Sequence, residues 1–64
     1  MSGIFYDPAE QRLRRVEREP EPAWMLVTHD LDASEHRCRR ILGEWLPFEA
    51  LRKVDWSALR LRAA

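Results

Sequence analysis

Residues 28–40 concentrate the reactive side chains of this chain. The segment THDLDASEHRCRR holds two histidines, three carboxylates, one cysteine and three arginines. Histidine, cysteine and carboxylate side chains are the usual ligands of zinc, and carboxylates beside a histidine are the usual groups of acid–base catalysis. Two kinds of chemistry are therefore considered for this segment, and each depends on the elements that position the side chains.

Helix geometry argues against a metal site. An apolar periodicity through Cys38 predicts a helix over residues 33–46, in which His36 and Cys38 lie about 160° apart around the axis. Cys38 then faces the core, where a free cysteine behaves as a small hydrophobic side chain. His36 shares its face with Arg40, whose charge repels a cation. We expect no metal and no cofactor.

Acid–base catalysis has equally little support. Asp32 is expected to cap the predicted helix, together with Glu35 three residues later, so its presence has a structural explanation. His29 and Asp30 have no such explanation and lie where a strand ends, a common position for ligand-binding residues. The chain has no set of nucleophile, base and orienting residue and no glycine loop that would cradle a phosphate. We therefore predict that the protein is not an enzyme, and we retain His29 and Asp30 as binding candidates.

The elements that hold these residues are predicted in the order β-α-β-α-β. A strand is expected at 3–6, a helix at 8–18 that begins with Asp7 and Pro8, a strand at 23–29 buried on both faces, and the helix at 33–46. Residues 51–62 fit either a strand or a helix. The strand reading gives a three-stranded sheet with parallel pairing and two helices, an α/β or α+β fold. The alternative is a mostly helical chain with one short strand pair.

Length and composition restrict the class of protein. Sixty-four residues make a single small domain, and a lone cysteine excludes an intrachain disulfide and favours a reducing compartment. The longest apolar run, residues 23–27, is far shorter than the roughly 20 residues that span a bilayer. We expect a soluble, cytoplasmic protein without a membrane partner.

Charge favours protein binding over nucleic-acid binding. The formal net charge is zero, with 11 basic and 11 acidic residues, whereas nucleic-acid binders usually carry a basic excess. Basic residues nevertheless outnumber acidic ones after residue 35, and Trp56 could stack on a base. Binding of nucleic acid by this arginine-rich second half is therefore kept as the alternative function.

Aromatic and arginine content points to an interaction module. Three tryptophans, two phenylalanines and one tyrosine are many for so small a core, and interfaces favour such residues together with arginine. We expect a regulator, inhibitor or adaptor that binds a larger protein, of the kind that phages use on host machinery, and a homodimer is also open. Trp24 and Trp45 are assigned to the core. The binding candidates are His29 and Asp30 with Trp56, Arg60, Arg62, Arg37, Arg40 and Tyr6.

Overall fold

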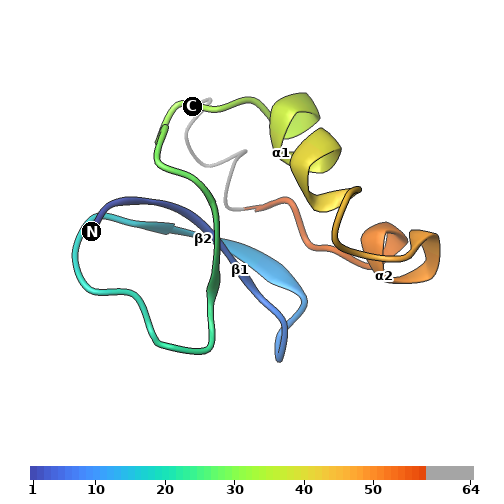
Figure 1. Cartoon of the computed structure of the whole chain (residues 1–64), viewed down its shortest axis with the longest axis horizontal. Coiled ribbons are helices and arrows are strands. Elements are labelled where there is room, and N and C mark those ends of the chain that lie inside the picture. The colour runs from blue at the N-terminus through green and yellow to red at the C-terminus, as the bar shows by residue number, and fades with distance from the viewer. Residues whose placement is uncertain (58–64) are drawn as a thin grey trace.

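The computed structural model describes residues 1–57 and shows a three-stranded antiparallel sheet with two helices (Figure 1). The elements are β1 (Gly3–Asp7), β2 (Arg12–Val16), β3 (Met25–Thr28), α1 (Glu35–Leu42) and α2 (Phe48–Arg52). The predicted fold class, a small α+β domain with three strands and two helices, is confirmed. Neither helix of the described part is long and apolar enough to cross a membrane.

The centre of the sheet is β1, and all five of its residues are buried. Its neighbours β2 and β3 are both antiparallel to it, so the parallel pairing predicted from the sequence is wrong. The expectation that residues 23–29 form a strand buried on both faces is also wrong. That strand is β3, at Met25–Thr28, where only Val27 is buried. It lies at an edge of the sheet, and within residues 1–57 it pairs with β1 alone.

One face of the sheet carries the main core. Alternate β1 residues Ile4 and Tyr6 point to this face, together with Leu13 of β2, and α1 packs against it. Cys38 and Leu42 of α1 are fully buried there, as the helical periodicity predicted. The remaining buried members of this core are Val27, Ala33 and Val54.

The helix predicted at 8–18 is wrong, because residues 8–11 form a turn and residues 12–16 form β2. Asp7 accepts hydrogen bonds from the amides of Ala9 and Glu10 at 3.0 and 3.2 Å, as a helix-capping aspartate would. The same contacts also stabilise a tight turn. The chain then reverses at Gln11, whose φ of 54° lies in the left-handed region, and β2 pairs with β1.

The second predicted helix is shorter than expected and begins two residues later. Its cap is Ser34, whose hydroxyl accepts from the amide of Arg37 at 3.1 Å, and not Asp32. The helix ends at Leu42 and a series of turns follows. Because the helical stripe stops there, Trp45 does not reach the core and is 43% exposed, which corrects its assignment. Trp24 is half-buried.

Of the segment predicted as either strand or helix, the structure describes residues 51–57, which hold the end of a helix and a single strand-like bridge. Helix α2 ends at Arg52. Val54 and Trp56 then pack against the core, Asp55 between them is exposed, and Ser57 already has helical backbone. Asp55 forms a single parallel bridge with Arg12 at the outer edge of β2. The predictions made for residues 58–62 lie outside the described residues.

Candidate interaction surfaces

His29 and Asp30, which follow the end of β3, make contacts within the protein. Asp30 accepts from the amide of Asp32 at 2.9 Å and from Nη1 of Arg37 at 3.1 Å, so it ties the loop to the first turn of α1. His29 is exposed, with Nδ1 3.3 Å from the carbonyl oxygen of Ser2. Among residues 1–57, no group of three or more histidine, cysteine or acidic side chains is placed to hold a metal ion. The structure therefore joins Asp30 to Arg37, whereas the contact of the His29 ring is with the backbone of Ser2.

Two of the binding candidates are much less exposed than expected. Tyr6 is only 3% exposed, within the main core, and burial, followed by the nearby charge of Asp7, raises the pKa of its hydroxyl. Trp56 is half-buried, and the guanidinium carbon of Arg39 lies 4.6 Å from the centre of its ring. Both residues were predicted to lie at a binding surface, and for Tyr6 that prediction is wrong. Arg60 and Arg62 lie outside the described residues.

Most of the described arginines in the second half of the chain form ion pairs with carboxylates. Arg37, Arg39 and Arg52 form ion pairs of 3.1, 2.8 and 3.4 Å with acidic residues that lie close in sequence. Arg40 is exposed on α1, where a hollow of about 290 Å³ is lined by Arg37, Arg40, Ile41 and Glu44. Three of the five basic residues that the structure describes after residue 35 therefore have a carboxylate partner nearby.

An exposed aromatic pair lies at the corner between the two helices. Phe48 is 72% exposed and Trp45 is 43% exposed, on either side of Pro47. The guanidinium carbon of Arg52 lies 6.0 Å from the centre of the Phe48 ring. We call Trp45, Pro47, Phe48 and Arg52 the helix-corner surface. Sequence analysis missed it, because the apolar periodicity placed Trp45 in the core. The signal that could have revealed it is Gly43, a residue typical of helix ends.

A second surface lies on the sheet face opposite the helices. The side chains of Phe5, Asp7 and Arg14 alternate with the core residues of β1 and β2 and so point to this other face. A shallow groove of about 450 Å³ runs along the edge strand β2, lined by residues 12–17 and Trp24, so residues of both sheet faces contribute to it. We call it the β2 groove.

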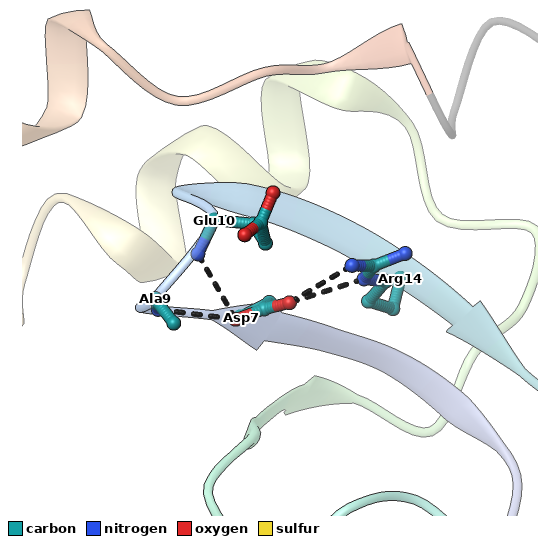
Figure 2. Close-up of polar contacts among 4 residues, drawn as sticks. All are labelled: Asp7, Ala9, Glu10 and Arg14. Atoms are coloured by element: carbon teal, nitrogen blue, oxygen red, sulfur yellow. Dashed lines mark hydrogen bonds and ion pairs between the residues drawn. The ribbon is translucent and has the colours of Figure 1, made fainter.

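One wall of the β2 groove is a fixed arginine (Figure 2). Asp7 Oδ2 accepts from Nε and Nη2 of Arg14 at 3.2 and 3.0 Å, and Asp7 Oδ1 accepts from the turn amides of Ala9 and Glu10. The same guanidinium lies 5.3 Å from the centre of the Trp24 ring. Burial alone would raise the pKa of the Asp7 carboxyl, but the hydrogen bonds from Glu10, Arg14 and Ala9 together hold it below its ordinary value.

Cys38, the remaining nucleophile of the reactive segment, is enclosed. Its side chain is fully buried in the core, and this burial raises the pKa of the thiol, although Arg37 and Arg15 act in the opposite direction. A thiol that is both buried and protonated is a poor nucleophile. Cys38 therefore belongs to the core and to neither surface.

Comparison with known proteins gives no relative to argue from. No protein-family model matches this chain, and neither a curated protein nor a solved structure matches it. Functional inference therefore rests on the surfaces described above.

Proposed function

We propose that this protein is a small non-catalytic module that binds a larger protein through its helix-corner surface. The observation that carries the proposal is the exposure of Phe48 and Trp45 within four residues of each other. Tryptophan is among the residues that most often dominate binding energy, and large aromatic side chains are enriched at interfaces. In this role the protein would act as a cytoplasmic regulator, inhibitor or adaptor.

The surroundings of the pair fit a protein partner. Glu44, Glu49 and Lys53, which lie close to the pair in sequence, are exposed charges of both signs, and Glu49 forms an ion pair with Arg52 of the surface. An apolar centre with a mixed polar rim is the common anatomy of protein interfaces. The segment that carries the pair is anchored on the core, because Leu46 and Leu51, which lie close to it in sequence, pack against the core.

Binding of nucleic acid is less well supported. Affinity for nucleic acid depends on arginines and lysines that can neutralise phosphates. Arg37, Arg39 and Arg52 already pair with carboxylates, and one face of Trp56 lies under the Arg39 guanidinium. A phosphate would have to displace these contacts, so the helix corner carries the proposal instead.

The proposal is tested by comparing two double variants of exposed apolar residues. Trp45→Ser with Phe48→Ser removes the helix corner, and Met25→Ser with Met1→Ser removes exposed apolar residues elsewhere. Captures from the native host are compared by quantitative mass spectrometry. We expect one partner that the first double variant loses and that the second double variant and the wild type retain. Equal recovery of every captured protein by all three chains would refute the proposal.

Self-association is measured separately by light scattering. A second copy at the helix corner would give a dimer that dissociates in the Trp45→Ser, Phe48→Ser variant and persists in the methionine variant. That outcome would replace a larger partner with a second copy of this chain. If the wild type is a monomer at all concentrations, the helix-corner surface is left to bind the larger partner.

A further inference from the structure

We propose that the outer face of α1 pairs, in antiparallel orientation, with the same face of a second copy of this chain. The face consists of Arg37, Arg40, Ile41 and Glu44, which together line a hollow of about 290 Å³. We call it the α1 outer face. It contains no residue of the helix-corner surface, so the inference goes beyond the function proposed above. Two observations carry it: the spacing of the four residues, and two charges among them that pair with no described residue.

The four residues follow the spacing of one helix face. They stand at i, i+3, i+4 and i+7, the spacing of side chains that lie above one another on a helix. Although α1 ends at Leu42, the amides of the next two residues donate to the carbonyl oxygens of Arg39 and Ile41 at 2.9 and 3.1 Å. The chain therefore keeps turning, and Glu44 lines the hollow together with Ile41. Ile41 is half-buried and gives the face its apolar part, whereas Arg40 is exposed.

Arg40 and Glu44 bring opposite charges to the α1 outer face. Among residues 1–57, neither side chain forms an ion pair or a hydrogen bond, although both line the same hollow. Arg37 differs, because Asp30 accepts from its Nη1 at 3.1 Å. Arg40 and Glu44 are therefore the two charges of this face that a partner can pair with.

The order of these two charges favours a second copy in antiparallel orientation. Arg40 precedes Glu44 along the chain, so a parallel copy would place like charges together. A twofold axis between the two helices instead places Arg40 of each copy beside Glu44 of the other, with the two Ile41 side chains near the axis. Such a contact uses the same patch on both copies and closes on itself, so association stops at a dimer. A free anion is disfavoured, because Glu44 would repel it beside Arg40.

The contact is small, so a weak dimer is expected. Four residues from each copy bury much less than the about 1,200 Å² at which standard interfaces begin. Exposed ion pairs each contribute little, and salt screens them. We therefore expect a Kd between roughly 10 μM and 1 mM at low ionic strength.

The test is sedimentation equilibrium of the full chain and of two charge-reversed variants. Arg40→Glu gives the face two negative charges at the paired positions, and Glu44→Arg gives it two positive charges. We expect each variant alone to dimerise at least roughly tenfold more weakly than the wild type. An equimolar mixture of the two variants should regain the wild-type affinity, because each negative face then meets a positive one. Neither variant carries both charges, so an ion pair within one chain cannot produce this recovery.

A matched pair of variants controls for net charge. Arg18→Glu and Glu21→Arg change the net charge by the same amounts at exposed positions between β2 and β3. We expect both to dimerise as the wild type does. The Trp45→Ser, Phe48→Ser variant should also keep the dimer, which separates the α1 outer face from the helix-corner surface.

Salt dependence of the wild type provides an arm that requires no variant to fold. The Kd should rise several-fold from about 20 mM to about 500 mM salt, and an unchanged Kd would overturn the inference. So would a wild type that remains a monomer at about 1 mM protein, or a folded Arg40→Glu variant with unchanged affinity. Failure of the mixture to recover the dimer, or loss of the dimer only in the Trp45→Ser, Phe48→Ser variant, would also overturn it.

Discussion

Replacement of Gln11 tests the hairpin that distinguishes this fold from the predicted helix. In the structure Gln11 has a φ of 54°, a region that costs a residue with a side chain about 1–2 kcal/mol and costs glycine little. Glycine also loses more chain entropy on folding, by about 0.5–1 kcal/mol. We therefore expect Gln11→Gly to stabilise the protein by about 0.5–1 kcal/mol, whereas Gln11→Ala keeps the strained φ and gains nothing.

A helix at residues 8–18 would reverse this order. Within a helix, glycine is about 1 kcal/mol less favourable than alanine. The two variants are compared by thermal unfolding, followed by circular dichroism, with the wild type alongside. For a domain of this size, 1 kcal/mol corresponds to roughly 4–8 °C, so the glycine variant should melt about 2–8 °C above the wild type. An alanine variant that melts above the glycine variant would refute the hairpin. The backbone bond from the Asp55 amide to the Gln11 carbonyl oxygen, 2.9 Å long, is available in both variants.

Three further predictions follow from buried groups. The pKa of Asp7 is lowered in the folded state, so its contribution to stability is present above the ordinary carboxyl pKa and is lost as pH falls through the lower folded value. In urea unfolding below about pH 4, the free energy of unfolding of Asp7→Asn should therefore fall less steeply with decreasing pH than that of the wild type. Equal slopes for the two proteins would contradict this. Cys38 should react with a thiol reagent only as fast as the protein unfolds, and rapid labelling of the native protein at pH 8 would show that it is not enclosed. Leu42→Ala should lower the free energy of unfolding by about 2–5 kcal/mol, much of the roughly 3–10 kcal/mol expected in total for a domain of this length. A decrease below about 1 kcal/mol in denaturant unfolding would contradict the place of Leu42 in the core.

The sequence predicts those parts of the fold in which one local pattern has a single interpretation. The run Ile4 to Tyr6 is a strand, and Cys38 and Leu42 share the buried face of a helix, as periodicity indicated. These features follow from apolar spacing, which tertiary contacts reinforce here and do not override.

The failures arise where one local pattern satisfies two structures. Asp7, Pro8 and Glu10 suit a helix start and a tight turn equally, and only pairing between β1 and β2 decides for the turn. Asp30, Asp32 and Ser34 are all good helix caps, so the cap depends on where β3 ends. The helix-corner surface follows from the end of α1 at Leu42, which periodicity alone does not set.

The most direct measurement of the proposed function separates binding from folding at Phe48. Because its side chain is 72% exposed, Phe48→Ser should change the free energy of unfolding by less than about 0.5 kcal/mol. The affinity of the captured partner for wild-type and Phe48→Ser protein is then measured by isothermal titration calorimetry. The account predicts a loss of at least about 2 kcal/mol in binding, or about thirtyfold in Kd. An unchanged Kd for the folded variant would contradict it.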